Sequence, residues 1–307
     1  MAAISRAQLL HELLPGLNAL FGMDYERYPE EYRDIYDEYS SERSFEEDQK
    51  LSGFMNVPEK QEGAATVFDT AQESYTTRYT MLTYSLGFSL TQEAFEDNLY
   101  DSLSARYVRE LSRAMSNTKN ISGANVLNTG FTALASGGYG VGDGQPLFST
   151  AHPMVGAPAQ ANTPTVAVDL NETSLEAATI QIAKWTDDRG KLLAAKVRKM
   201  IVPVDNQYVA TRILDTQLQT GTANNDVNAV RVMGAVPEGF AVNNFITDTD
   251  SWYLTTNVPD GFKYFNRVSE STDSDGDFDT GNLRWKVRSR WAFGASDWMA
   301  GWASPGA

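Results

Sequence analysis

Apolar and polar side chains alternate at every second position in two stretches of the chain. In residues 82–90 the intervening positions hold Thr, Ser or Gly, and in residues 282–293 most of them hold Arg or Lys. A two-residue period places one kind of side chain on each face of an extended strand. The sequence therefore predicts two strands, each with one buried face. Their apolar positions are Leu82, Tyr84, Leu86, Phe88 and Leu90 in the first strand and Leu283, Trp285, Val287, Trp291 and Phe293 in the second.

The polar face of the second strand carries a stripe of four cations. A row of Arg and Lys side chains can bind phosphate groups or carboxylates. The chain has a net charge of −15, so a second copy of it offers many carboxylates. We therefore favour carboxylates over phosphates as the partner and expect the stripe to be a contact between subunits. The four residues are Arg284, Lys286, Arg288 and Arg290.

Two other stretches have the period of an amphipathic helix. After Thr91, which is suited to cap a helix, apolar residues recur every four positions. This pattern predicts a helix to about Asn117, with a length of about 40 Å. Thr173 and Glu176 fit a capping box at the start of a second helix, and Gly190 is suited to its end. The inward positions of that helix are Leu175, Ala178, Ile182 and Trp185.

Shorter patterns complete the chain and favour the α+β class. Residues 194–203 have the composition of a strand, and residues 206–218 that of a short helix. Strand-like runs follow at 229–236, 251–258 and 261–268. Between Glu59 and Thr77 the chain is polar, with few apolar anchors. That segment is predicted to be a long excursion that returns to the strand at 82–90.

Five tyrosines stand in an acidic segment near the N-terminus. Eleven Asp and Glu lie between Asp24 and Asp48, against three Arg. The tyrosine spacings of 3, 4, 4 and 3 predict one face of a helix, interrupted by Pro29. Burying five rings gains roughly 20 kcal/mol, and ordering about 15 residues costs a similar amount. We therefore expect an arm that orders against a neighbouring subunit. Its contacts would be Tyr25, Tyr28, Tyr32, Tyr36 and Tyr39.

Composition excludes several classes of site. The 307 residues include no Cys, which excludes a thiol nucleophile and a disulfide framework. No run of about 18 apolar residues suggests a membrane span. The net charge of −15 disfavours general binding to nucleic acid, because phosphates repel an acidic protein.

The one candidate for catalysis is the stretch QPLFSTAHPMVGAP at 145–158. It places Ser149 three residues before His152, so a serine hydrolase is an alternative to consider. Ser149 lies outside any Gly-x-Ser-x-Gly elbow, however, and Pro153 restricts His152 to extended geometry. We favour a structural turn made by Phe148, His152 and Pro153. In that turn Phe148 would plug an apolar surface, and a ring nitrogen of His152 would donate a hydrogen bond.

Two further motifs fail as ligand sites. The stretch SGGYGVGDG at 136–144 lacks the spacing of a phosphate-binding loop. The stretch DSDGDFD at 273–279 resembles the start of a calcium loop, but its sixth and twelfth positions are wrong, and a solvated turn is favoured. We therefore expect no cofactor and no metal.

Nearly the whole chain, and most specifically residues 145–214 and 283–303, resembles the major capsid proteins of tailed bacteriophages. The resemblance is carried by PLFSTAHP, by the run TSLEAATIQIAKWTDDRGKLLAAKVRKMIVPVDNQYVATRIL, and by the ending NLRWKVRSRWAFGASDWMAGWAS. It implies the Hong Kong ninety-seven capsid fold, an α+β fold. By that resemblance, 1–45 would be the N-terminal arm and 46–85 the extended E-loop. A P-domain with a long spine helix would span 86–165, the A-domain 166–258, the P-domain return strands 259–293, and an A-domain C-terminal segment 294–307.

The resemblance also implies a function. The subunits would self-assemble into hexamers and pentamers of an icosahedral head that encloses double-stranded DNA without sequence-specific contact. The protein would belong to the virion, and to the host cytoplasm during assembly. A separate scaffolding protein, a portal and a decoration protein would be its partners, with no membrane. A compartment shell of the encapsulin type, which shares the fold, is the alternative.

Overall fold

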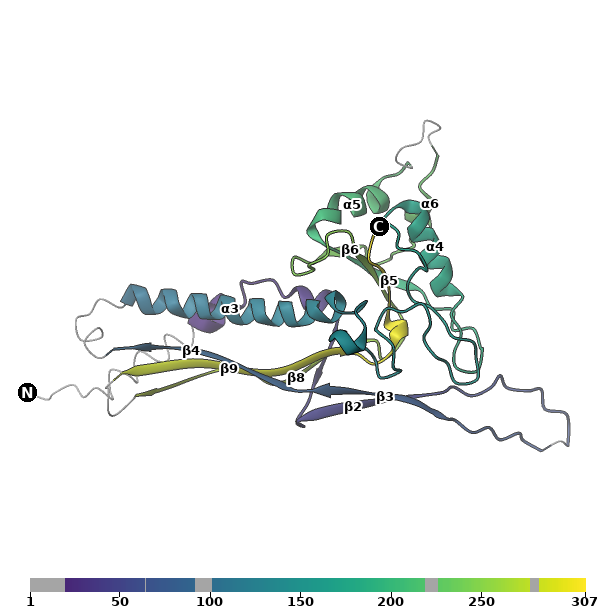
Figure 1. The fold of residues 1–307 in the computed structure, drawn as a ribbon, viewed down its shortest axis with the longest axis horizontal. Helices are drawn as coiled ribbons and strands as arrows, with labels where there is room; N and C mark the ends of the chain where they lie inside the picture. The colour runs from purple at the N-terminus through teal and green to yellow at the C-terminus, as the bar shows by residue number, and fades with distance from the viewer. Residues whose placement is uncertain (1–19, 64, 92–100, 219–225, 277–281) are drawn as a thin grey trace, which may run out of the picture.

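The computed structural model describes residues 20–63, 65–91, 101–218, 226–276 and 282–307 (Figure 1). Two sheets and one long hairpin organise this part of the chain. No helix within it is long and apolar enough to cross a membrane.

The first sheet holds both strands that the alternating pattern predicts. Its order is β1-β8-β9-β4, formed by Asp37–Ser40, Phe262–Gly276, Leu283–Ala295 and Leu82–Leu90. Strand β4 pairs antiparallel with β9, and β1 pairs parallel with β8. Along β9, Trp285, Val287 and Trp291 are buried, whereas Arg284 and Lys286 are exposed. The prediction of two faces is therefore confirmed for this strand.

The long helix α3, Asp101–Asn128, lies along one face of this sheet (Figure 1). The predicted start of the helix falls on residues 92–100, outside the described ones. Its predicted end at Asn117 is wrong, because the helix continues eleven residues further through a polar stretch. The reason is tertiary packing. Gly123 lets the N-terminal segment approach closely, since a Cβ built there would stand 3.0 Å from the Cβ of Tyr32.

The second sheet, ordered β10-β7-β5-β6, lies in the upper part of the molecule (Figure 1). Its strands are Gly301–Ser304, Trp252–Thr256, Val197–Val202 and Phe240–Val242. The helices α4, Glu172–Ala183, and α5, Gln207–Asp215, belong to the same part. Strands β5 and β7 and helix α5 agree with the predicted elements. The C-terminal residues thus complete a sheet whose other strands come from residues 197–256.

Three local predictions need correction. Residues 229–236 form a short helix, α6 (Ala229–Met233), and no strand, because Asn228 caps its start and Gly234 takes a positive φ at its end. Helix α4 is capped by Asn171 and ends before Gly190, which lies in a later turn. Residues 273–276 belong to β8 and form no turn.

A third feature is a long hairpin that projects from the body of the molecule (Figure 1). Strands β2, Phe45–Leu51, and β3, Glu73–Thr80, pair antiparallel with each other only. The residues between them form no strand or helix within the described part. This agrees with the predicted excursion. We call residues 46–85 the E-loop segment and residues 52–72 its tip.

The tyrosine segment near the N-terminus forms no amphipathic helix. Glu31–Asp34 make the short 3₁₀ helix η1, and Tyr39 already lies in β1. Tyr32 and Tyr36 are buried against Phe293, on the inner side of β9. The expectation of an arm without a core of its own is therefore wrong for these two residues. Their rings fill the space between α3 and the sheet.

Candidate functional site

The buried polar corner around His152 was the candidate for catalysis. His152 is fully buried, with its ring stacked on Trp298 at a centroid distance of 4.6 Å. Its Nδ1 lies 2.6 Å from Asp143 Oδ2, and its Nε2 lies 3.1 Å from Asn162 Oδ1. Both ring nitrogens therefore face oxygen acceptors. The corner joins the stretch 143–162 to Trp298, which lies far away in sequence.

This corner lacks the geometry of a serine hydrolase. The Ser149 hydroxyl accepts a hydrogen bond from the Ala151 amide, and the His152 nitrogens face Asp143 and Asn162 instead of Ser149. A triad needs the base within hydrogen-bond reach of the nucleophile. The full burial of His152 also leaves no room for a substrate beside it. The arrangement supports the structural interpretation of the turn.

Phe148 behaves as the expected plug. It is buried, and its ring lies 5.0 Å from that of Phe131 and 5.7 Å from that of Tyr253. Pro153 is exposed and follows a bridge in which His152 and Gln160 exchange two backbone hydrogen bonds. The turn thus anchors one side in the core and leaves the other at the surface.

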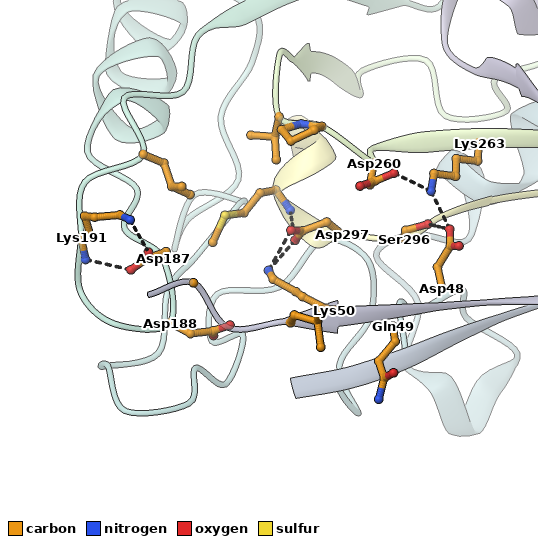
Figure 2. A pocket seen from close by; sticks show the side chains of 16 residues that line it. Asp48, Gln49, Lys50, Asp187, Asp188, Lys191, Asp260, Lys263, Ser296 and Asp297 are labelled. Carbon is orange, nitrogen blue, oxygen red and sulfur yellow. Dashed lines mark hydrogen bonds and ion pairs between the residues drawn. The ribbon is translucent and has the colours of Figure 1, made fainter. Parts of the chain in front are cut away.

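A charged cleft of about 560 Å³ lies between strand β2, at the base of the E-loop segment, and three stretches of the body, 187–193, 258–263 and 296–299 (Figure 2). Lys50 pairs with Asp297 at 2.8 Å, and both side chains are mostly buried. Lys263 lies 2.7 Å from Asp48 and 2.7 Å from Asp260. On the other side of the cleft, in the loop after α4, Lys191 pairs with Asp187 at 3.8 Å. Every lysine that lines the cleft therefore has a carboxylate partner. The pairs of Lys50 with Asp297 and of Asp48 with Lys263 hold the hairpin to the body.

The tip of the E-loop segment differs sharply from its base. Its links to the body are polar: Arg189 lies 3.6 Å from Asp69, and Lys191 donates to the Phe54 carbonyl at 3.4 Å. Its apolar side chains point into solvent, with Val57 94% and Phe68 92% exposed. Such a surface needs a partner to be buried. Leu51, Phe54, Met55 and Val67 are exposed as well.

The five tyrosines split into two groups. Tyr32 and Tyr36 belong to the core, and the Tyr36 hydroxyl donates to the Gly123 carbonyl at 2.7 Å. Burial raises the pKa of Tyr36 well above its ordinary value. Tyr25 and Tyr28 are half-buried, and Tyr39 is 42% exposed. Tyr25, Tyr28 and Tyr39 therefore remain candidates for contacts between subunits.

A buried cation explains why the tyrosine segment packs here. Lys119 on α3 is almost fully buried and pairs with Glu270 at 2.9 Å. Its Nζ lies 5.2 Å from the centroid of the Tyr32 ring and 5.1 Å from that of Tyr264, within the range of cation–π attraction. Tyr25 donates a hydrogen bond to the same Glu270 carboxylate. Glu270 of β8 thus neutralises a charge that would otherwise be costly to bury, and the tyrosine segment shields the pair.

The cation stripe on β9 is not uniform. Lys286 pairs with Asp273 of β8 at 3.0 Å, and Arg284 lies opposite Asp275. Arg288 and Arg290 lie opposite Ser271 and Val268, where no carboxylate is available. The structure therefore places all four cations on one face but neutralises only one half of the stripe within the chain.

Three important residues carried no signal in the sequence. Asp143 lies in the glycine-rich loop that was considered only as a phosphate cradle, and Asn162 lies in a gap without a pattern. Arg267 joins the stripe from β8 by way of a bulge. Asn162 is defined by the distant carbonyls of Trp298 and Gly301, and Asp143 by a contact with His152 that no spacing rule predicts. The sequence shows the charge of Arg267 and the glycine-rich loop around Asp143, but it does not show which residues lie beside them in the fold.

Comparison with known proteins decides the family. A family model described as "Phage capsid protein" matches residues 73–304, about three quarters of the chain. The chain belongs to this family of phage capsid proteins. The capsid protein is therefore a structural component of the virion and not an enzyme. The match does not favour a compartment shell of the encapsulin type. No curated protein sequence matches the chain.

Solved structures share the fold of this capsid protein at low sequence identity. A virus-like particle from Pyrococcus furiosus has a TM-score of 0.53 at 10% identity, covering 95% of this chain and 99% of that one. The structure from Mycobacterium phage Che8 has a TM-score of 0.52 at 12% identity, covering 89% of each chain. The procapsid of bacteriophage JBD30 has 0.52 at 15%, covering 98% of this chain and 76% of that one. Together they show an α+β capsid fold of the Hong Kong ninety-seven type.

The capsid protein shows no metal centre in the part of the chain that the structure describes. No group of three or more His, Asp or Glu there is placed to hold a metal ion. The carboxylates of the charged cleft are instead paired with lysines (Figure 2). The surfaces that remain for function are those on which other subunits can pack.

Proposed function

We propose that this capsid protein self-assembles into hexamers and pentamers of an icosahedral head that encloses double-stranded DNA. The exposed apolar tip of the E-loop segment is the observation that carries the proposal. Val57 and Phe68 are almost fully exposed on a hairpin whose strands pair only with each other. Burying such side chains against a neighbour gains about 25 cal/mol per Å² of apolar surface. Many small contacts of this kind reinforce one another in a closed shell.

The elements support the proposed division into domains. The P-domain would consist of 86–165 with α3 as its spine helix and 259–293 with β8 and most of β9. The A-domain would consist of 166–258 and the C-terminal segment 294–307, whose strand β10 pairs with β7. The N-terminal arm would span 1–45 and the E-loop 46–85. In this division the His152 turn lies beside the boundary between the P-domain and the A-domain.

Further partners belong to the same proposal. Assembly would take place in the host cytoplasm with a separate scaffolding protein, and the finished head would carry a portal and a decoration protein. The similarity to the JBD30 procapsid supports an assembly intermediate of this kind. The DNA would be packed inside without sequence-specific contact, in keeping with the charge of −15.

The proposal is tested by assembly of the purified chain. Analytical ultracentrifugation and electron microscopy, at high concentration and with scaffolding protein, are expected to show large closed or curved particles. The double variant Val57→Ser/Phe68→Ser is expected to keep the melting temperature of the subunit and to lose most particles. Val166→Ser, which removes an exposed apolar side chain outside the hairpin, is the matched control. A wild-type chain that stays monomeric under all these conditions would contradict the proposal.

A further inference from the structure

The polar face of β9 changes character along its length because its partner strand β8 changes. At the outer end, Asp275 and Asp273 of β8 lie opposite Arg284 and Lys286. Opposite-charge pairs across strands are stabilising. Further along, Ser271 lies opposite Arg288, and its hydroxyl donates to the Arg288 carbonyl at 3.2 Å. The β4 side supplies only Ser85 and Thr83. The inner half of the stripe therefore has no carboxylate across either strand.

A bulge in β8 adds a third arginine to this inner half. Asn266 lies opposite Trp291 and Val268 opposite Arg290, so Arg267 is an extra residue between them. Partial burial, followed by the like charges of Arg267 and Arg288, lowers the pKa of Arg290. We call Arg267, Arg288 and Arg290 the arginine cluster. Three cations thus gather on one patch of a strongly acidic protein.

The arginine cluster has no counter-charge in the described part of the chain. The ion pairs found there within 4.0 Å include none of its three members. Arg290 donates one long hydrogen bond, 3.5 Å, to the Met81 carbonyl, and its Nε is buried without a partner. Like charges held together on a surface repel one another. The cluster therefore raises the energy of the isolated subunit and is suited to bind an anionic group.

The tip of the E-loop segment offers matching anions. Glu59 and Glu62 are exposed and form no ion pair among the described residues. In the sequence they lie between Val57 and Val67, two of the exposed apolar residues of the tip. The tip also projects away from β8 and β9 of its own chain, the strands that carry the arginine cluster (Figure 1). Its carboxylates are therefore available to another subunit.

We infer that the arginine cluster is the docking surface for Glu59 and Glu62 of the E-loop tip of a second copy. This inference rests on the proposed self-assembly and names the partner of its polar contact. Arginine suits the role because its planar guanidinium binds carboxylates with two parallel hydrogen bonds. Charge complementarity at such a contact sets register and suppresses wrong partners.

The first test compares neutral variants of the two halves of the stripe. Arg288→Gln/Arg290→Gln removes the repulsion in the subunit and the docking charge together. Its melting temperature as a free subunit is expected to stay equal or rise, while the critical concentration for assembly rises about tenfold. Lys286→Gln, in the half neutralised by Asp273, is expected to leave the critical concentration within about twofold. Equal critical concentrations for the wild type and the double variant would overturn the inference and leave the proposed capsid function standing.

The second test exchanges the charges. Glu59→Arg/Glu62→Arg and Arg288→Glu/Arg290→Glu are each expected to assemble poorly, and the chain that carries all four changes is expected to recover most of the particles. Failure to recover, with all variants folded by circular dichroism, would overturn the pairing. Gel-shift titration with a short DNA duplex checks the other anion. Loss of DNA binding in Arg288→Gln/Arg290→Gln with unchanged assembly would assign the cluster to phosphates and overturn the inference.

Discussion

At the scale of single residues, Asn162 shows how one side chain joins segments that no sequence pattern connects. Its Nδ2 lies within hydrogen-bond distance of the carbonyls of Leu147, Trp298 and Gly301. Its Oδ1 accepts from the Ser149 amide at 2.9 Å and faces His152 Nε2. The three carbonyls fix which end of the amide is the oxygen. Asp143 accepts from the other side of the His152 ring, so the whole corner depends on this histidine.

The corner predicts unequal effects of two neighbouring substitutions. His152→Ala would remove the ring stacked on Trp298 and leave the buried Asp143 carboxylate without its partner. We expect the free energy of unfolding of the subunit to fall by about 3–5 kcal/mol. Ser149→Ala loses one hydrogen bond at the surface, and we expect a fall of less than about 1 kcal/mol. Urea denaturation of the free subunits measures both. Equal losses in the two variants would mean that the histidine does not hold the corner.

At the scale of elements, local periodicity predicted which stretches are strands better than it predicted where they lie and which faces are buried. The alternation in 82–90 and 282–293 identified β4 and β9, because a two-residue period belongs to the strand itself. The predicted buried face of β4 is wrong at Leu82 and Leu86, which are over half exposed because β4 is an edge strand of the sheet. The tyrosine spacing imitated a helix, but each ring is placed by a separate contact. The helix at 229–233 depends on caps at Asn228 and Gly234, which outweigh its β-branched residues.

The corrected position of the tyrosine segment changes what its variants should do. Tyr36 packs on Phe293 at 5.0 Å and bonds to Gly123. Tyr36→Ser is therefore expected to destabilise the subunit by about 3–5 kcal/mol. Tyr39 is exposed on the edge strand β1, with Phe265 at 5.7 Å. Tyr39→Ser is expected to leave the melting temperature nearly unchanged and to reduce particle yield. Thermal melting of free subunits separates the two variants. A stable Tyr36→Ser subunit would return this residue to the set of contacts between subunits.

At the scale of the whole molecule, the distribution of charge disfavours binding to DNA. The net charge of the chain is −15, but in places lysines and carboxylates pair with each other, as in the cleft at the base of the hairpin (Figure 2). The arginine cluster is the strongest exception that we find among the described residues. The sequence showed two of its members but not their isolation, because isolation depends on the register of β8 against β9. Net charge could be read from composition, whereas its local balance required the fold.

This distribution predicts weak and salt-sensitive binding of free subunits to DNA. A protein that contacts three phosphates through three arginines would lose affinity with a log–log salt slope of about −2.7. Its affinity would then fall about fortyfold between 50 and 200 mM salt. Repulsion by the remaining charge weakens binding further, so we expect a dissociation constant above about 10⁻⁴ M at physiological salt. Fluorescence anisotropy with a labelled duplex, read across a salt series, gives both quantities. Submicromolar binding that persists above about 0.3 M salt would require a larger cationic surface than the fold provides, and it would make the protein a nucleoprotein instead of a shell around packed DNA.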